Sequence, residues 1–117
     1  MSHDEARSRL LAKRAATLGH RDTLARSFTD IVDGARDANV DDEHDPEGST
    51  VAAERSMVAS LGRGAQERLA QIDRALARLD DATYGVCLRC GDPIDERRLA
   101  ALPAAEHCVD CARRSRA

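Results

Sequence analysis

Two matched pairs of cysteines constrain this chain more than any other feature. The pairs are Cys87 and Cys90 in CLRC and Cys108 and Cys111 in CVDC, with 17 residues between them. Tetrahedral zinc takes four thiolates at about 2.3 Å, and a tight turn supplies two of them when two residues separate the cysteines. Gly91, directly after Cys90, permits such a turn and lets backbone N–H groups face the sulfur. The spacing predicts one zinc ion, and a structural one, because four protein ligands leave no open position for water.

Other uses of the four thiols fit the sequence less well. Two disulfides would involve the same cysteines, but the chain begins with the charged segment MSHDEARSRL rather than an apolar secretory signal. We therefore expect a cytoplasmic protein, and in the reducing cytosol paired cysteines hold metal more often than they form disulfides. A thioredoxin-like redox pair needs a βαβ setting, and a catalytic zinc needs an open position and a nearby general base. His107, next to Cys108, is an alternative ligand, although an ordinary surface histidine is the more common case.

The residues before the cysteines are typical of long helices. Ala, Glu, Lys, Leu and Arg make up 57 of the 117 residues, and no proline precedes Pro46. Residues 4–38 are predicted to form one helix. Its apolar face comprises Leu24, Phe28, Ile31 and Ala35, continued toward the N-terminus by Leu11, Ala15 and Leu18. A second helix is predicted from Pro46, with Asp45 as its N-cap, to about residue 81. Its seam repeats by heptads at Val58, Ala65, Ile72 and Leu79, and at Leu69 and Leu76.

The two helices are predicted to pair as an antiparallel hairpin. Residues 37–54 contain seven acidic residues and no Lys or Arg, and Pro46 and Gly48 mark a turn. The chain has 21 Ala but only 11 Leu, so the seams are thin and the hairpin needs an anchor at its open end. The cysteine segment follows at that end. We expect a mainly α fold, with a long helical hairpin (coiled coil) in residues 1–83, an acidic turn near 39–49, and a small four-cysteine zinc-finger base in residues 84–117.

The cysteine segment resembles a known family. YGVCLRCGDPIDERRLAALPAAEHCVDCA, residues 84–112, is similar to the C4-type zinc finger of the DksA/TraR family of bacterial transcription factors. The similarity rests on the aromatic–Gly pair before Cys87, the CG pair, the final CVDCA, and Ile94, Arg98, Leu99, Ala101 and Pro103. The resemblance implies a short C-terminal helix and a zinc ion that holds the base to the hairpin. It also implies a regulator, not an enzyme, that binds RNA polymerase and inserts its hairpin into the secondary channel without binding DNA.

By the same resemblance, the acidic turn is the working tip of the hairpin. The carboxylates expected to contact the partner are Asp41, Asp42, Asp45 and Glu47. Members of the family often carry Asp-x-x-Asp-x-Ala at the tip, whereas this chain has Asp42-x-x-Asp45-x-Glu47. An acidic turn between two helices is also expected simply because charge runs are solvated.

The base is expected to offer a second contact surface. Its candidate residues are Arg97, Arg98, Arg113 and Arg114. Some members of the family help to bind the alarmone ppGpp through basic residues near the finger. This chain has Leu102 before Pro103 and Ala112 after Cys111, which cannot hold a phosphate. We therefore expect no ppGpp site.

Two other classes of function fit the sequence less well. A zinc ribbon that binds nucleic acid or another protein directly would use the six arginines of the last third. Five acidic residues nearly cancel their charge there, and only Tyr84 is available to stack on a base. A thiol or metal enzyme would need a catalytic arrangement of side chains that the sequence does not show. No apolar run approaches the roughly 20 residues that span a bilayer.

Overall fold

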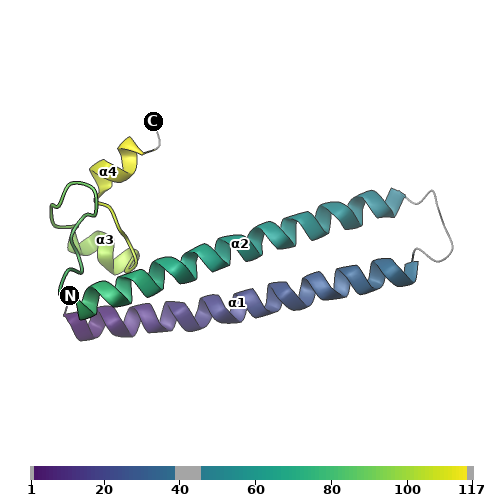
Figure 1. The fold of residues 1–117 in the computed structure, drawn as a ribbon, viewed down its shortest axis with the longest axis horizontal. Helices are drawn as coiled ribbons and strands as arrows, with labels where there is room; N and C mark the ends of the chain where they lie inside the picture. The colour runs from purple at the N-terminus through teal and green to yellow at the C-terminus, as the bar shows by residue number, and fades with distance from the viewer. Residues whose placement is uncertain (1, 39–45, 116–117) are drawn as a thin grey trace. The chain divides into compact units, whose positions relative to one another are not determined.

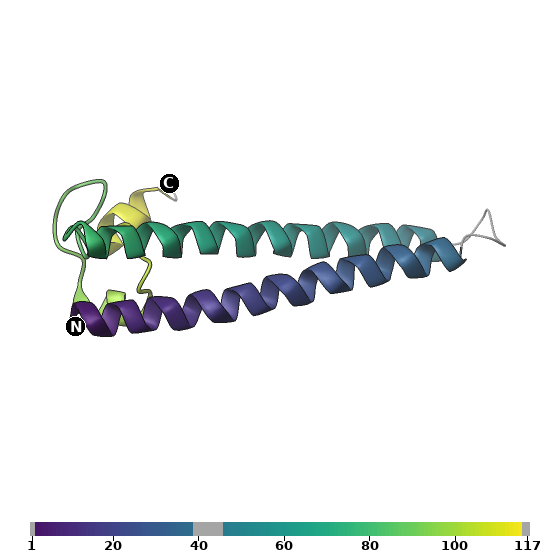
Figure 2. The same cartoon turned by 60° about the horizontal axis from the view of Figure 1, so that its bottom comes forward.

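A computed structural model of the chain describes residues 2–38 and 46–115, with side chains for 2–34 and 50–115. Its helices, in order, are α1 (His3–Ala38), α2 (Pro46–Asp80), α3 (Glu96–Ala101) and α4 (Val109–Arg114). The long helices α1 and α2 run side by side and antiparallel in both views (Figures 1 and 2). The predicted mainly α fold, with a helical hairpin, a cysteine segment and a short C-terminal helix, is confirmed. None of the described helices is both long enough and apolar enough to cross a membrane.

The chain divides into two compact units. The cysteine unit consists of Met1–Ala16 and Leu69–Ala117, and the central unit consists of Thr17–Arg68. Each long helix therefore contributes one segment to each unit. The predicted division into a hairpin at 1–83 and a finger at 84–117 stays a prediction.

The seam of α2 is confirmed, but part of the seam predicted for α1 is wrong. Ala65, Leu69, Ile72 and Leu79 of α2 are all buried. On α1, Leu11 is 50% exposed and Ala15 is exposed, whereas Leu10 is completely buried. The buried face of α1 instead follows the heptad spacing of Leu10 and Leu24, which are 14 residues apart. Arginines at the neighbouring positions 14 and 21 are half-buried and concealed this repeat in the sequence.

Three arginines of α1, one heptad apart, mark the register of the two long helices. In the cysteine unit, Arg7 Nη2 lies 2.7 Å from Asp80 Oδ1, and Arg14 Nε lies 2.8 Å from Asp73 Oδ1. In the central unit, Arg21 Nη1 donates to Gln66 Oε1 at 3.3 Å. From pair to pair, the α1 residue advances by seven positions while the α2 residue recedes by seven. The same antiparallel register therefore holds in each unit.

Glutamate in place of Gln66 is expected to raise the free energy of unfolding by about 0.2–1 kcal/mol. The reason is that a charged acceptor for Arg21 would replace a neutral one at an exposed site. Urea unfolding of the zinc-loaded protein measures the gain, which should shrink at high salt because exposed charges are screened. With Arg21→Ala as the background, the gain should vanish. A gain that survives there would contradict the pairing.

The end of α2 has an unusual residue in its turn. Ala82 has φ of +59°, in the left-handed region that disfavours side chains with a Cβ. The N–H of Thr83 donates to the Arg78 carbonyl at 2.9 Å, and the N–H of Ala82 donates to the Leu79 carbonyl at 3.4 Å. This pattern is a Schellman motif, in which glycine is the usual residue at the left-handed position.

Glycine in place of Ala82 is expected to stabilise the protein by about 0.5–1 kcal/mol. Relief of the left-handed strain of about 1–2 kcal/mol outweighs the larger backbone entropy of glycine in the unfolded chain. Thermal or urea unfolding measures the change. As a matched control, Ala77→Gly lies inside α2 at an exposed position and should lower stability by about 1 kcal/mol. Equal effects of the two substitutions would contradict the strain at Ala82.

The cysteine unit contains two clusters of buried side chains. The helix cluster consists of Ala6, Leu10, Ile72, Ala75 and Leu79. The cysteine cluster consists of Cys87, Ile94, Leu99 and Cys111. Tyr84 packs against both clusters, and its hydroxyl donates to the Pro103 carbonyl at 2.8 Å. By comparison, the central unit has a small apolar core, because the buried apolar side chains of its described part are Leu24 and Ala65.

Candidate metal centre

The first cysteine pair lies on a tight turn. The N–H of Gly91 donates to the Cys87 carbonyl at 3.0 Å, and the N–H of Cys87 donates to the Asp92 carbonyl at 2.8 Å. Gly91 has φ of +79°, so the turn requires the conformation that glycine adopts without a Cβ penalty. The turn expected from the Cys90–Gly91 pair is therefore confirmed.

The second pair lies at the start of α4. Cys108 is the N-cap residue of this helix, and Cys111 is buried within it. The N–H of Ala112 donates to the Cys108 carbonyl at 2.9 Å, as in a helical turn. One pair is thus presented by a turn and the other by the first turn of a helix.

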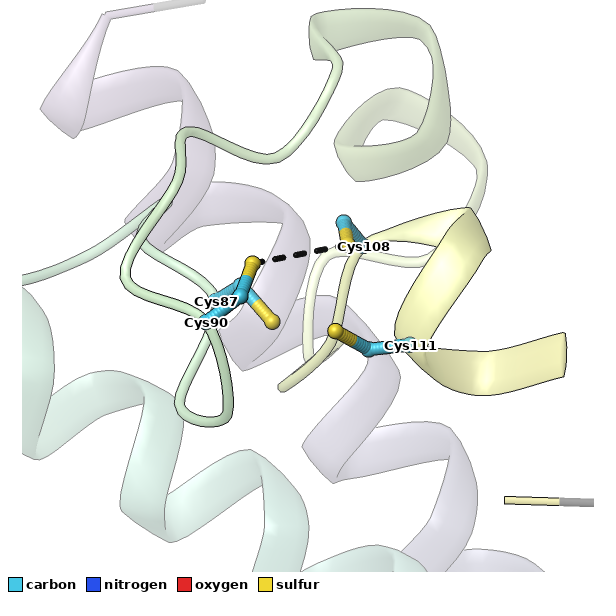
Figure 3. Close-up of side chains that lie close together, drawn as sticks. All are labelled: Cys87, Cys90, Cys108 and Cys111. Atoms are coloured by element: carbon cyan, nitrogen blue, oxygen red, sulfur yellow. Dashed lines mark hydrogen bonds between the residues drawn. The ribbon is translucent and has the colours of Figure 1, made fainter. Parts of the chain in front are cut away.

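The four sulfur atoms are placed as one metal ion requires. The Sγ atoms of Cys87, Cys90, Cys108 and Cys111 all lie within 4.8 Å of one another, and Figure 3 shows them facing a shared space. The Sγ atoms of Cys90 and Cys108 are 3.8 Å apart. A tetrahedron with zinc–sulfur bonds of about 2.3 Å has edges of about 3.8 Å. The donor set therefore fits one tetrahedral zinc ion, and the exposed His107 does not belong to the cluster.

Backbone groups and burial act differently on the four thiols. The N–H of Cys90, and after it those of Cys108 and Arg89, lower the pKa of Cys87 to about 5, although burial opposes them. Burial, followed by the neighbouring thiols, raises the pKa of Cys111 to about 12. Four thiolates at this spacing repel one another unless a cation lies between them, and a bound metal deprotonates its thiol ligands outright. The cluster is therefore built for a cation.

Cations of α1 hold the C-terminal end of α3. Arg9 Nη1 donates to the Ala100 carbonyl at 3.1 Å, and Lys13 Nζ donates to the Ala101 carbonyl at 3.3 Å. The last carbonyls of a helix lack partners within it and carry partial negative charge. These contacts attach the segment between the two cysteine pairs to the hairpin.

The sequence-predicted contact residues fall into two groups. Arg97, Arg113 and Arg114 of the base are exposed, whereas Arg98 is half-buried and its Nε donates to the His107 carbonyl at 2.9 Å. The tip residues Asp41, Asp42 and Asp45 lie outside the described residues. Glu47 is in α2, but its side chain also lies outside the described part.

Sequence reasoning missed two features of the finger. One is α3, which begins after Asp95, whose side chain accepts the N–H of Arg97 at 2.8 Å as an N-cap. An aspartate ahead of a helix-forming run was an available signal. The other is Glu106, whose contacts with α2 span more than 30 positions and leave no local signal.

Comparison with known proteins gives matches for both the finger and the hairpin. Residues 82–117 match the family model of the prokaryotic dksA/traR C4-type zinc finger. The RNA polymerase-binding transcription factor DksA of Escherichia coli is 34% identical over 93 residues, which cover 78% of this chain and 58% of that protein. The chain thus spans little more than half the length of this curated relative.

Two solved structures have a similar arrangement. Transcription factor DksA2 from Pseudomonas aeruginosa matches with a TM-score of 0.79 and 24% identity, over 97% of this chain and 82% of that one. The DnaK suppressor protein from Agrobacterium tumefaciens matches with a TM-score of 0.53 and 33% identity, over 96% of this chain and 92% of that one. The first likeness concerns the fold alone, while the second extends to the sequence along nearly all of both chains.

Proposed function

Because this chain belongs to the DksA/TraR family of C4-type zinc-finger proteins, we propose that it is a bacterial transcription regulator that binds RNA polymerase in the cytoplasm. The observation that carries the proposal is the extent of the similarity. The match with the RNA polymerase-binding factor of E. coli covers 93 residues, far more than the finger at 82–117. The similarity therefore includes the hairpin as well as the cysteine segment.

The finger supports a structural rather than a catalytic role. We propose that Cys87, Cys90, Cys108 and Cys111 bind one zinc ion, whose coordination they would complete. A zinc ion with four protein ligands has no open position for water or substrate. The ion would fix the two cysteine turns relative to each other, and the protein would act by binding rather than as an enzyme.

The hairpin would act through its acidic turn. We propose that the turn enters the secondary channel of the polymerase, with Asp41, Asp42, Asp45 and Glu47 at the tip. A channel that leads to a catalytic Mg²⁺ attracts carboxylates at short range. Because the tip motif has Glu47 in place of alanine, its effect on promoter complexes is a separate question from binding.

The base would supply a docking surface without a nucleic-acid site. The exposed Arg97, Arg113 and Arg114 are proposed to contact the polymerase, together with Arg98, whose Nε is bonded to the His107 carbonyl. Acidic residues of the same segment balance these charges, which argues against a basic DNA-binding surface. Leu102 and Ala112 argue against ppGpp binding.

Titration with core RNA polymerase tests the proposal. A fluorescent non-canonical residue at position 39 leaves the four thiols untouched and reports on burial of the tip. Saturable binding with a change in this signal is the expected result, and Asp42→Ala combined with Asp45→Ala should weaken it. As a control, Asp22→Ala with Asp30→Ala removes two exposed carboxylates of α1 and should bind as the parent does.

Two outcomes would contradict parts of the proposal. Absence of saturable binding at micromolar polymerase would exclude this function for the chain. Equal binding by the parent and the tip variant would exclude a role of Asp42 and Asp45 in docking, while the polymerase would remain the partner.

A further inference from the structure

Glu106 makes the most extensive side-chain contacts between the finger and α2. Arg74 donates through Nη2 to Oε1 at 2.9 Å and through Nε to Oε2 at 3.1 Å, so the pair is bidentate. Gln71 Nε2 donates to Oε1 at 3.4 Å, and Arg78 Nη1 lies 3.7 Å from Oε2. The carboxylate thus meets three residues of α2, spaced along two turns of one helix face.

The backbone of Glu106 is linked to both cysteine pairs. Its carbonyl accepts the N–H of Leu88, the neighbour of Cys87, at 2.8 Å. Two positions later, the chain reaches Cys108. Glu106 itself lies between α3 and α4, outside any helix. Its position therefore depends on how the two cysteine pairs are held.

The charge environment makes this contact costly to break. The side chains of Glu106 and Arg78 are only 12% and 11% exposed, and Arg78 Nη2 is buried without a hydrogen-bond partner. Loss of Glu106 would leave a buried guanidinium without its counter-charge, which is strongly unfavourable. In contrast, Asp80 and Asp73, which pair with α1, are 67% and 52% exposed and contribute little.

We propose that Glu106 is a positioning residue that transmits zinc occupancy to the C-terminal turns of α2. Zinc fixes residues 106–108, the carboxylate is then held against Gln71, Arg74 and Arg78, and these turns of α2 become ordered. Loss of zinc releases the carboxylate and loosens α2, although none of the four cysteines belongs to this helix. The inference does not depend on binding to RNA polymerase.

Coupling of this kind is reciprocal, which gives a test from the α2 side. Arg74→Ala should weaken the affinity for zinc by about tenfold. Losses of this size are typical when a residue that orients the metal ligands, without contacting the metal itself, is removed. Asp73→Ala, the matched control on the next residue of α2, removes the ion pair with Arg14 and should leave zinc affinity within twofold. Competition of the full chain with a chromophoric chelator measures both affinities.

Hydrogen exchange tests the same coupling from the zinc side. In the parent protein, removal of zinc should accelerate amide exchange in residues 70–80 by at least tenfold. Glu106→Ala should exchange in this segment as the metal-free parent does, while cobalt substitution still gives the thiolate-to-metal absorption of four sulfur ligands. Glu106→Gln keeps one of the two acceptor oxygens for Arg74 and should restore part of the protection.

The outcomes are distinct. The proposal is overturned if Arg74→Ala binds zinc as tightly as the Asp73→Ala control, or if zinc removal leaves exchange in residues 70–80 unchanged. It is also overturned if Glu106→Ala keeps the protection of the zinc-loaded parent. If Glu106→Ala does not retain metal, the proposal is tested by the chelator competition alone, in which the zinc affinity of Arg74→Ala is compared with that of Asp73→Ala.

Discussion

Serine in place of Cys111 is expected to abolish tight zinc binding and to unfold residues 84–115. Cys87 and Cys111 are two of the four members of the cysteine cluster, whose other members are Ile94 and Leu99, with Tyr84 partly buried against them. A few such apolar side chains, each worth about 1.5–3 kcal/mol, cannot order a segment of this length. Apparent binding energies of structural zinc reach about 10–16 kcal/mol, so the metal supplies most of the driving force for folding here.

Measurement of this effect needs both metal content and local structure. Atomic emission should give one zinc per chain for the parent and well below one for Cys111→Ser. Backbone NMR signals of residues 84–115 should collapse to the narrow range of an unfolded segment, while circular dichroism retains part of the helical signal. Ala112→Ser, a half-buried neighbour that is not a ligand, serves as the control and should keep both properties. A zinc-loaded and well-dispersed Cys111→Ser protein would refute the structural role.

The parts of the fold that sequence predicts are those with a local cause. Heptad spacing in α2 places Ala65, Ile72 and Leu79 on one buried face, and each position is set by helix geometry alone. The two CxxC pairs likewise predict a metal site, because the two cysteines of each pair are close in sequence and their arrangement is local. For α1, the local signal was misleading. Leu11 and Ala15 suggested an apolar face, but the residues that flank the buried heptad are half-buried arginines. The aliphatic part of an arginine side chain can cover apolar surface, and a search for hydrophobic residues alone does not detect it.

The parts that sequence did not predict depend on tertiary contacts. The pairing of Arg7 with Asp80 and of Arg14 with Asp73 follows from the register of the hairpin, which no single helix encodes. Glu106 has no distinctive sequence context, yet it meets Arg74 because the finger folds back on α2. Its partner lowers the pKa of the Glu106 carboxyl, chiefly through the hydrogen bond from Arg74. The cysteines were therefore predictable, whereas the residue that links them to the hairpin was not.

Alanine in place of Tyr84 is expected to lower the free energy of unfolding by about 3 kcal/mol, near the lower end for loss of a large aromatic side chain. Tyr84 is the residue that packs against both the helix cluster and the cysteine cluster. Its removal leaves a cavity at their junction and an unsatisfied carbonyl on Pro103, which is almost completely buried. Both clusters are small, so neither has spare apolar surface with which to fill the gap.

Phenylalanine at position 84 separates packing from hydrogen bonding. Tyr84→Phe keeps the ring between the clusters and loses only the bond to Pro103, so the expected loss is about 1–2 kcal/mol. Urea unfolding of zinc-loaded proteins, followed by circular dichroism and by zinc release, measures both variants. In the parent, the two signals should change together, because Tyr84 couples the clusters. In Tyr84→Ala, zinc release should precede loss of helix, since the finger then has less contact with α1 and α2. Equal losses for Tyr84→Ala and Tyr84→Phe would show that the hydroxyl, and not the ring, joins the two clusters.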